Sequence, residues 1–506
     1  MNLKKIYLLI NSLELERGGL TKANLQQASM FSELGYETYI LTFNYNSDYN
    51  GIIEDIYDVY KVNKKVKIIN MYDYFRNEDQ IDQKFKSYKN LINDDSIVEK
   101  NDSKDIVKIY ENGLYKKNIS YRSDESIKKI DYFNNSNYRI KVEFYAPEGY
   151  IGKLSYMYYN LNRPRQMTFY NSIGNCYLRK TVNPENGLAT KVDLIKKGQI
   201  VHSFRSDRQL KSYFVEQIVN NNKDSVIISD ARNTDDIMIN IKNENSSKNV
   251  RLHSNHLSPN GEIAKTVMTS LENLKNIDSL IVLTSQQKED IVNNYGYSEK
   301  VKVIPHGIQT LPSKDINNII RKNKAVVISR LVKLKQIDHI IKAMQLIKDD
   351  DPDFILEIYG NGNELENLKS LVKKNKLENN IIFKGYTNNP LEIYNESLLS
   401  ITTSKSEGFS LSILESMASG TPVISYDFKY GPEEIIDNNK NGLVINKDNI
   451  KELAEKILYL KNNEKVLKDM SEKSIEKIEE KFSIQSVKKK WFEFIENNNI
   501  TNPNNL

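Results

Sequence analysis

Short hydrophobic runs alternate with amphipathic stretches over the first 75 residues of the chain. Residues 6–10 predict a buried strand, residues 21–34 predict a helix that ends at Gly35, and residues 37–43 predict a second strand. A strand, a crossover helix and a second strand are typical of the start of a doubly wound parallel sheet. The same pattern predicts a second parallel sheet after residue 324, with strands at residues 325–329, 355–359, 381–384, 399–403, 423–426 and 443–445.

Between residues 77 and 205 the pattern changes to short alternating stretches separated by close turn signals. No crossover helix is evident there, so the pattern predicts an antiparallel β meander inserted into the first α/β domain. The region is rich in tyrosine, which offers apolar area with a polar tip, and Arg163 and Arg165 offer charge to a polyanion. A ligand-docking face or an oligomer interface is the favoured interpretation, and a plain core is the alternative. Its expected strands lie at residues 106–110, 138–145, 152–159, 167–170, 176–181 and 191–195.

We therefore expect an α/β chain of four parts. Residues 1–76 and 206–310 form a first Rossmann-like domain, and residues 77–205 form the inserted β domain. Residues 311–485 form a second Rossmann-like domain, and residues 486–506 form a C-terminal helix that crosses back, with a frayed tail. Two doubly wound domains imply a cleft in which a ligand meets the carboxyl ends of both sheets.

Composition narrows the class of protein only slightly. The chain has 506 residues and a net charge of +5, from 72 basic and 67 acidic residues, which does not indicate nucleic acid as a partner. Its single cysteine, Cys176, excludes an internal disulfide and favours a reducing compartment. No apolar run approaches the roughly 20 residues that span a bilayer, and the short run near the N-terminus is interpreted as a strand rather than a signal segment. We expect a cytoplasmic protein that can visit the inner face of the membrane as a peripheral protein, through a partner.

Two glutamates eight positions apart are the most specific chemical signal in the chain. Glu407 follows a predicted strand, and Glu415 lies about two turns into the next predicted helix, on roughly the same face. Between them, Gly408 and the free N–H groups of the helix start are suited to an anion. Solvated acids at a helix start would explain Glu407, but a second carboxylate within an apolar run is costly without a hydroxyl partner. The pair predicts a ligand with hydroxyls at both ends and phosphate in the middle, which is the shape of a nucleotide sugar.

Cations and glycines are expected in matching loops of the two sheets. Arg330 and Lys335 follow the first strand of the second sheet and can converge on a diphosphate without a metal. Gly18 and Gly19 lie in the first strand-to-helix loop, where they allow close approach of a phosphate or sugar. Solvated surface cations and an ordinary glycine pair are the alternatives, and there is no GxGxxG pattern.

The run from His253 to His256 follows another short strand. A metal site is disfavoured because no third histidine or cysteine ligand lies nearby. A neutral His253 that hydrogen-bonds sugar hydroxyls fits better, and simple packing is the alternative. Gly360 and Tyr386 lie in the loops after two later strands, where backbone groups can contact a base edge or merely form turns.

Together these residues resemble the retaining glycosyltransferases of family 4, which have the GT-B fold. The inserted β domain is similar to that of a narrower group of Gram-positive enzymes that glycosylate wall teichoic acid or serine-rich adhesins. The N-terminal stretch and the run at residues 253–256 look most like the teichoic acid α-glycosyltransferases. The resemblance covers residues 1–75 and 206–495, and it rests on Gly18-Gly19, Val303-Ile304-Pro305-His306-Gly307-Ile308, Ser329-Arg330, Lys335, Gly360, Tyr386, Lys429-Tyr430-Gly431-Pro432, Glu407 and Glu415.

The resemblance implies a UDP-sugar donor and a role for each site residue. Arg330 and Lys335 would hold the diphosphate, Glu415 the ribose hydroxyls, and Glu407 the hydroxyls of the donor sugar. His253 would meet the 6-position of that sugar. Further substrate contacts are implied for Gly18, Gly19, Asn255, Gly360, Tyr386 (on uracil), Gly408, Leu411 and Ser412.

By the same resemblance, the reaction moves glucose or N-acetylglucosamine to hydroxyls of a polyol-phosphate polymer, the wall teichoic acid, with retention of configuration. No metal or other cofactor is expected, and the enzyme is expected to be a homo-oligomer, with a trimer through the β insertion. A protein O-glycosyltransferase for serine-rich adhesins is the main alternative. A non-catalytic GT-B partner subunit is a second alternative, although it would be expected to lose the charged ligands that this chain retains. Whether Glu407 orients the sugar or forms a transient bond to it is left open.

Overall fold

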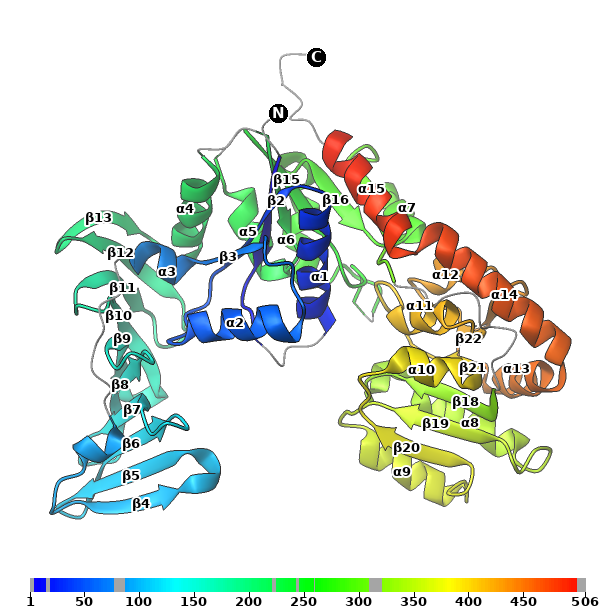
Figure 1. The fold of residues 1–506 in the computed structure, drawn as a ribbon, viewed down its shortest axis with the longest axis horizontal. Coiled ribbons are helices and arrows are strands. Elements are labelled where there is room, and N and C mark those ends of the chain that lie inside the picture. The colour runs from blue at the N-terminus through cyan, green and yellow to red at the C-terminus, as the bar shows by residue number, and fades with distance from the viewer. Residues whose placement is uncertain are drawn as a thin grey trace. The chain divides into compact units, whose positions relative to one another are not determined.

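A computed structural model describes residues 4–14, 19–76, 87–220, 224–242, 245–258, 260–308 and 321–497. Its contacts divide the chain into two compact units, with the boundary between Lys248 and Asn249. Among the described residues there are two parallel sheets and one antiparallel sheet (Figure 1). The expected α/β class, with an antiparallel sheet inserted into the first α/β domain, is confirmed.

The first parallel sheet has the strand order β17-β16-β15-β14-β1-β2-β3. The order reverses between β1 and β14, so the sheet is doubly wound, as the hydrophobic pattern predicts. Its strands are β1 (Lys5–Ile10), β2 (Glu37–Thr42), β3 (Lys67–Asn70), β14 (Ser225–Ser229), β15 (Ser246–Arg251), β16 (Ser279–Val282) and β17 (Val301–Val303). Its helices are α1 (Gly19–Glu33), α2 (Tyr49–Val59), α3 (Met71–Arg76), α4 (Asp207–Val219), α5 (Arg232–Ile239), α6 (Lys265–Glu272) and α7 (Ser285–Tyr295).

The inserted sheet is an antiparallel meander in which each strand pairs with the next along the chain. Its β11, β12 and β13 contact α3 and α4, so one end of the meander is anchored to the first α/β domain. Four of its strands, β4, β6, β7 and β13, lie outside the stretches that the sequence predicted. The strands are β4 (Ile97–Asn101), β5 (Ile106–Glu111), β6 (Leu114–Tyr121), β7 (Ile127–Phe133), β8 (Arg139–Tyr145), β9 (Ile151–Tyr158), β10 (Arg163–Tyr170), β11 (Cys176–Val182), β12 (Ala189–Lys196) and β13 (Gln199–Phe204).

The second parallel sheet has the order β20-β19-β18-β21-β22-β23, so its topological switch point lies between β18 and β21. The strands are β18 (Lys322–Ile328), β19 (Ile355–Tyr359), β20 (Ile381–Gly385), β21 (Ser397–Thr402), β22 (Val423–Tyr426) and β23 (Gly442–Ile445). The helices are α8 (Ile337–Ile347), α9 (Leu365–Lys374), α10 (Pro390–Asn395), α11 (Leu411–Ala418), α12 (Pro432–Ile435), α13 (Ile450–Asn462), α14 (Glu464–Lys481) and α15 (Ile484–Asn497).

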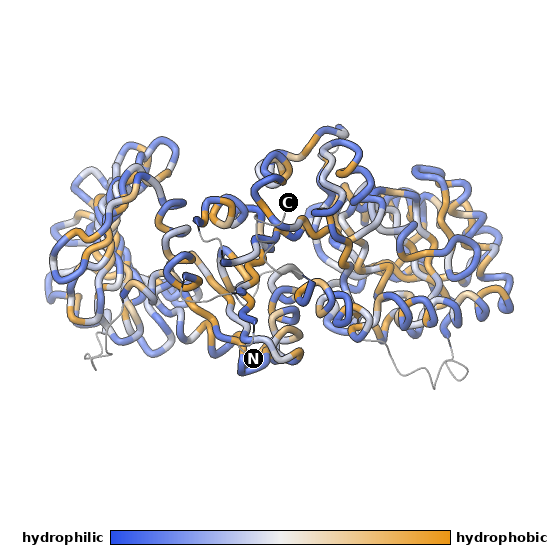
Figure 2. The backbone as a smooth tube through the Cα atoms, turned by 90° about the horizontal axis from the view of Figure 1, so that it is seen from above, coloured by the Kyte–Doolittle hydropathy of each residue, from blue (hydrophilic) through white to orange (hydrophobic). Residues whose placement is uncertain are grey.

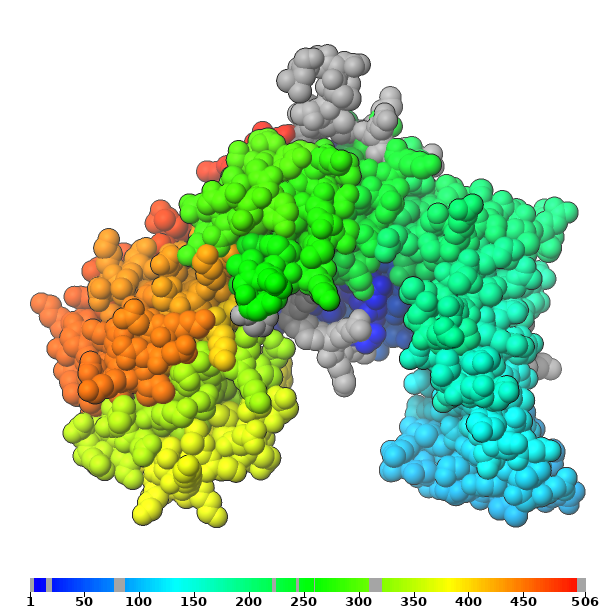
Figure 3. All heavy atoms as spheres, turned by 180° about the vertical axis from the view of Figure 1, so that it is seen from behind, coloured from blue at the N-terminus to red at the C-terminus, as the bar shows by residue number. Residues whose placement is uncertain are grey.

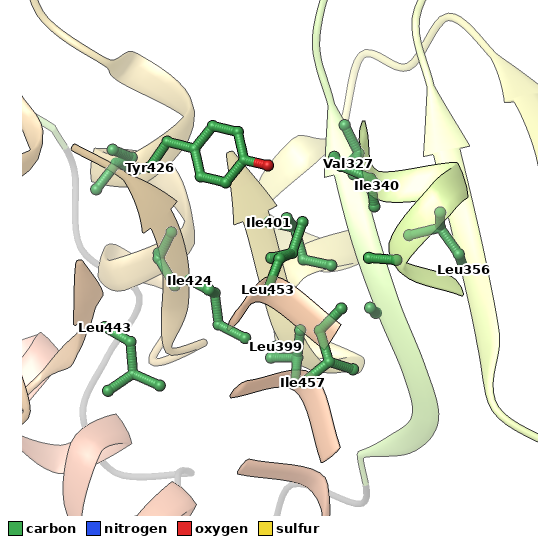
Figure 4. Close-up of a cluster of buried hydrophobic side chains, with 14 of the residues drawn as sticks. Val327, Ile340, Leu356, Leu399, Ile401, Ile424, Tyr426, Leu443, Leu453 and Ile457 are labelled. Carbon is green, nitrogen blue, oxygen red and sulfur yellow. The ribbon is translucent and has the colours of Figure 1, made fainter. Parts of the chain in front are cut away.

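Continuous apolar strands build the core of this second sheet. Leu399 and Ile401 of β21 lie beside Val327 of β18, and Leu453 and Ile457 of α13 cover them (Figure 4). Because helices cover a parallel sheet on both faces, its strands are apolar without alternation. Along the backbone, short hydrophobic segments (orange) alternate with hydrophilic ones (blue) (Figure 2).

The C-terminal helix α15 contacts the part of the first sheet that belongs to the second unit. Trp491 is buried, and the Arg251 guanidinium lies 5.2 Å from its ring. The backbone N–H of Ile308 donates to the carbonyl of Phe482, and a side chain at Gly307 would collide with Val487. None of the described helices combines the length and apolar character that a membrane span requires.

Candidate active site

The loop between β21 and α11 holds Glu407 at the switch point of the second sheet. Its carboxylate accepts a hydrogen bond from the Ser404 hydroxyl at 2.7 Å and forms an ion pair with the Lys335 ammonium at 2.7 Å. Both side chains of this ion pair are largely buried, at 14% and 16% exposure. The structure therefore brings Lys335 and Glu407 together across 72 residues of sequence.

Backbone contacts fix the turn that carries Lys335. The Thr403 hydroxyl donates to the carbonyl of Lys335 at 2.9 Å, and the N–H of Lys405 donates to the carbonyl of Leu334 at 2.8 Å. The turn after β18 is thus tied to the loop after β21. Lys335 and Ser412 also line one small recess, about 10 Å³ in volume, between the ends of these strands.

Arg330 is exposed beside this turn, and its guanidinium has no ion-pair or hydrogen-bond partner among the described residues. Two glycines hold its backbone in place. A Cβ at Gly360 would lie 1.8 Å from the carbonyl oxygen of Ser329, and a Cβ at Gly362 would lie 2.1 Å from that of Leu331. Gly360 therefore packs against the strand end that presents Arg330, which leaves a cation available at the mouth of the sheet.

Helix α11 carries the second glutamate of the pair. Leu411 at its first position is 41% exposed, and Glu415 is half-buried. Both glutamates act on the buried hydroxyl of Tyr394. Its burial is the main cause that raises the pKa of Tyr394 well above its usual value, and the negative charges of Glu415 and Glu407 raise it further. The two carboxylates of the pair therefore act on one buried hydroxyl group.

Gly408 allows the glutamate loop to pass against the segment that follows β15. A Cβ at Gly408 would lie 2.5 Å from the carbonyl oxygen of His253. The Asn255 amide donates to the Ser406 hydroxyl at 2.7 Å and to the carbonyl of Lys429 at 3.3 Å. Its amide oxygen accepts from the N–H of Leu257 at 2.8 Å. Asn255 thus fastens the loop next to Glu407.

Three histidines surround this segment. The His253 and His306 rings stack with centroids 5.5 Å apart, and His253 is half-buried. Burial first, then the charges of Arg251 and His253, lower the pKa of His306 well below its usual value. His306 is therefore neutral at physiological pH. His256 is buried against the Tyr430 ring, and burial lowers its pKa too.

A charged cluster that sequence reasoning missed lies on the same loops. The Asp290 carboxylate of α7 binds the Lys429 ammonium at 2.6 Å and the Tyr430 hydroxyl at 2.5 Å. These bonds outweigh burial and hold the pKa of Asp290 below its usual value. Glu434 accepts a hydrogen bond from the N–H of Ser285 at the start of α7, at 2.8 Å. No local pattern signals these contacts, because about 140 residues separate the partners.

Three further candidate residues lie elsewhere. Tyr386 follows β20 and is 72% exposed, in a position open to a ligand. Gly19 is the first residue of α1, and Gly18 lies outside the described residues. Within the described part of the chain, no group of three or more histidine, cysteine, aspartate or glutamate side chains is arranged to hold a metal ion.

The arrangement is suited to a phosphorylated ligand. Lys335 lines one recess with Ser412 near the N-terminal end of α11, where the first N–H groups of a helix favour an anion, and Arg330 lies on the same loop after β18. Two carboxylates on the same loop and helix can accept hydrogen bonds from hydroxyl groups. A crevice at the carboxyl ends of strands flanking a switch point is where open parallel sheets bind ligands.

Comparisons with known families agree with this chemistry. Residues 312–477 match the family "Glycosyl transferases group 1", and residues 7–190 match "Glycosyl transferase 1 domain A". The chain is similar to the poly(ribitol-phosphate) α-N-acetylglucosaminyltransferase of Staphylococcus aureus, with 29% identity over 97% of this chain and 99% of that protein. It is also similar to the poly(glycerol-phosphate) α-glucosyltransferase of Bacillus subtilis, with 29% identity over 97% of this chain and 75% of that protein.

A solved structure shares the whole fold. A variant of S. aureus TarM, crystallised with fondaparinux, α-GlcNAc-glycerol and UDP, superposes with a TM-score of 0.81 at 28% sequence identity. The superposition covers 97% of this chain and 100% of that one. The two parallel sheets and the inserted antiparallel sheet therefore occur together in a protein whose crystals hold a nucleotide and a sugar derivative.

Proposed function

Because the chain belongs to the group 1 glycosyl transferases, we propose that it moves a hexose from a UDP-sugar to hydroxyl groups of a polyol-phosphate polymer, with retention of configuration. Poly(ribitol phosphate) and poly(glycerol phosphate) are the acceptors named for the two full-length relatives. The polymer is thus a wall teichoic acid, and the sugar is glucose or N-acetylglucosamine.

One observation carries the proposal: the ion pair of Lys335 and Glu407 at the switch point is 2.7 Å long, and the same loop carries Arg330, whose guanidinium has no partner among the described residues. A donor diphosphate needs two cations, and the transferred sugar needs a carboxylate next to them. In the donor complex Arg330 and Lys335 bind the diphosphate, and Glu407 accepts hydrogen bonds from the sugar. Lys335 then divides its hydrogen bonds between a phosphate oxygen and Glu407, which keeps both charges neutralised in a dry site.

The remaining residues complete the donor site. Glu415 binds the ribose hydroxyls, and His253 meets the 6-position of the sugar. The main chain near Tyr386 contacts uracil. Further substrate contacts come from Gly18, Gly19, Asn255, Gly360, Gly408, Leu411 and Ser412.

In the reaction, the bond between the anomeric carbon and the phosphate oxygen breaks, and a bond from the acceptor oxygen to the same carbon forms. Negative charge grows on the leaving UDP, and Arg330 and Lys335 stabilise it. The acceptor proton passes to the departing phosphate. Glu407 holds the sugar, and a transient covalent role for it is the second route to retention. No metal or other cofactor takes part.

The β insertion holds the subunits of a homo-oligomer together, with three subunits as the proposed number. The enzyme works in the cytoplasm, at the inner face of the membrane where the polymer is assembled. It has no nucleic-acid partner, since its net charge is only +5.

One assay tests the proposal. Purified protein is incubated with UDP-glucose or UDP-N-acetylglucosamine and with poly(ribitol phosphate), poly(glycerol phosphate) or a serine-rich adhesin fragment. Mass spectrometry then detects the added hexose. We expect transfer in at least one pairing of sugar with polyol polymer. Transfer to the protein fragment alone would refute the polymer acceptor and support the protein O-glycosyltransferase alternative.

A further inference from the structure

Several basic side chains gather where the inserted sheet packs on the first α/β domain. Lys180 of β11 donates to the Tyr72 hydroxyl at 2.8 Å and forms an ion pair with Asp207 of α4. Arg76 of α3 forms an ion pair with Asp73 at 3.1 Å. Each of these cations has a carboxylate partner within the same unit.

Lys153 of β9 differs from them. Its ammonium nitrogen lies 4.7 Å from the ring centroid of Phe144, 5.4 Å from that of Tyr45 and 5.8 Å from that of Phe169. Among the described residues, the Lys153 ammonium has no hydrogen-bond partner and no ion pair. Burial, with the charge of nearby Lys180, lowers the pKa of Lys153 to about 8. The aromatic rings thus hold a cation whose charge is neutralised by none of the described carboxylates.

Lys153 lies next to the edge of the first parallel sheet at which ligands of such sheets bind. Tyr45 follows β2, so its ring lies at the carboxyl edge of the first parallel sheet, where ligands of such sheets bind. The Tyr45 hydroxyl lies only 2.5 Å from where a Cβ at position 152 would be, so Gly152 allows this close approach to β9. The insertion therefore carries a cation to the ligand edge of a sheet in which it takes no part. Lys153 is half-buried, which leaves part of its side chain exposed.

We propose that Lys153 binds a phosphate of the acceptor polymer, an inference that rests on the proposed function. The donor diphosphate has Arg330 and Lys335 as its own cations, so Lys153 is available for a second phosphorylated substrate. A polyol-phosphate chain carries one negative charge in each repeat, and a charge next to aromatic rings is poorly screened. A purely structural lysine is the competing explanation, and the variants below separate the two.

The test compares Lys153→Met, which keeps the apolar length between the rings, with Lys153→Arg, which keeps the charge. With poly(ribitol phosphate) or poly(glycerol phosphate) as acceptor, we expect Lys153→Met to raise the KM for polymer about 3–10-fold, as for one lost phosphate contact. The slope of log KM against log salt should fall by about 0.7, the value for one contact to a flexible polyanion. In Lys153→Arg, the KM for polymer and the salt slope should both lie close to their wild-type values.

A matched control removes a lysine that already has a partner. Lys108 of β5 forms an ion pair with Glu99 at 2.8 Å, toward the other end of the same sheet. Lys108→Gln deletes one charge as Lys153→Met does, and we expect it to leave the KM and the salt slope unchanged.

The outcomes separate this inference from the proposed function. If the wild-type protein transfers sugar to neither polymer, the proposed function fails, and this inference fails with it. If the wild type transfers sugar and Lys153→Met keeps the wild-type KM and salt slope, only the inference is overturned. A lower melting temperature with an unchanged KM would likewise show a structural lysine. Inorganic phosphate that stabilises the wild type but not Lys153→Met, without competing with polymer, would overturn the acceptor assignment.

Discussion

The second parallel sheet and the inserted antiparallel sheet place their charged and aromatic side chains differently. In the parallel sheet, Lys335 and Glu407 meet at the switch point, and apolar segments of the strands form the core. The inserted sheet spreads lysine and tyrosine over a broad surface, where Tyr156, Tyr158 and Tyr159 are 37–49% exposed. These tyrosines, with Lys141 and Arg165 among their neighbours, line a hollow of about 800 Å³. Figure 3 shows the insertion from sky blue to sea green.

This difference suggests a division of labour. A small ligand with a few fixed charges needs convergent groups on rigid elements, which the switch point supplies. An extended partner needs area, and a meander can change its surface residues without disturbing a reaction centre. Under the proposed function, donor chemistry lies in the second sheet, and binding of the acceptor or of another subunit lies in the insertion. We therefore expect substitutions in the two regions to have different effects.

The largest effect is expected at the switch point. Lys335→Ala and Glu407→Ala should each lower the turnover number by about 10²-fold or more, because each removes a preorganised charge beside the reacting atoms. Initial rates with saturating UDP-sugar and polymer measure the change. Thermal unfolding followed by circular dichroism provides the control for folding. If either variant folds and keeps a turnover number near that of the wild type, the assignment of Lys335 and Glu407 to the donor site is wrong.

A backbone change near Arg330 should have the next largest effect. Gly360→Ala places a Cβ 1.8 Å from a carbonyl oxygen at a φ of +128°, so the segment of Arg330 must shift. We expect a loss of about 10–100-fold in kcat/KM, because displacement of a positioning group by about 1 Å can cost 10²-fold.

Gly296→Ala is its matched control. Gly296, which follows α7, also has a positive φ, of +74°, but a Cβ there would meet no atom within 4 Å. It should cost only about 1–2 kcal/mol of stability from the left-handed backbone, with little change in kcat/KM. Equal losses of activity in the two variants would contradict a specific role of Gly360 in holding Arg330.

Substitutions in the inserted sheet should change the oligomeric state of the protein and leave the rate of the chemical step unchanged. Replacing Tyr158 and Tyr159 together by serine removes two exposed rings from the hollow. Because aromatic residues are typical anchors of interfaces, we expect a lower molar mass by light scattering. The same substitutions should leave UDP-sugar hydrolysis without acceptor near the wild-type rate. If the molar mass and the polymer KM both stay unchanged, this hollow is neither the subunit interface nor an acceptor surface.

The smallest effect concerns pH. The pKa of His306 lies well below its usual value of 6.5 in the folded chain, so below pH 6.5 the unfolded chain binds more protons than the folded chain. The stability contributed by neutral His306 is therefore complete above pH 6.5 and is lost as the pH falls toward the folded pKa. The loss should approach about 1.4 kcal/mol for each pH unit.

Urea unfolding at pH 7.5 and pH 5.5 measures this loss of free energy. His306→Phe cannot take up a proton, so it should reduce the difference between the two pH values. A wild-type pH dependence in this variant would show that His306 titrates alike in both states, and the stacked His253–His306 pair would then not hold it neutral.

Sequence patterns predicted the parallel sheets and the residues of the switch point because both depend on local order. Glu407 and Arg330 each come soon after an apolar strand in the sequence. A residue at that point in the sequence is expected at the carboxyl edge of the sheet. Strands β6 and β7 were missed because lysines interrupt their alternation, as in Leu114–Tyr121.

The contacts of Asp290 and Asn255 had no local signal at all. They join residues about 140–150 positions apart through side-chain hydrogen bonds, such as those from Asp290 to Tyr430 and from Asn255 to Ser406. Only the packing of α7 and of the glutamate loop determines which side chains meet there. A hydrophobic pattern predicts which face of a helix or strand is buried. It does not predict which polar residue from a distant part of the sequence will contact that element.

The packing of helix α15 also affects whether the second unit stays together after its chain is cleaved by a protease. Trp491 and Val487 bind the helix to the segment around Arg251 and Gly307, while the preceding helix α14 packs on α11 of the second sheet. Residues 249–308 are thus connected to the second sheet by buried contacts as well as by the peptide bonds of residues 309–320. A protease that nicks the chain within 309–320 should yield two fragments that migrate together under native conditions and separate only in denaturant.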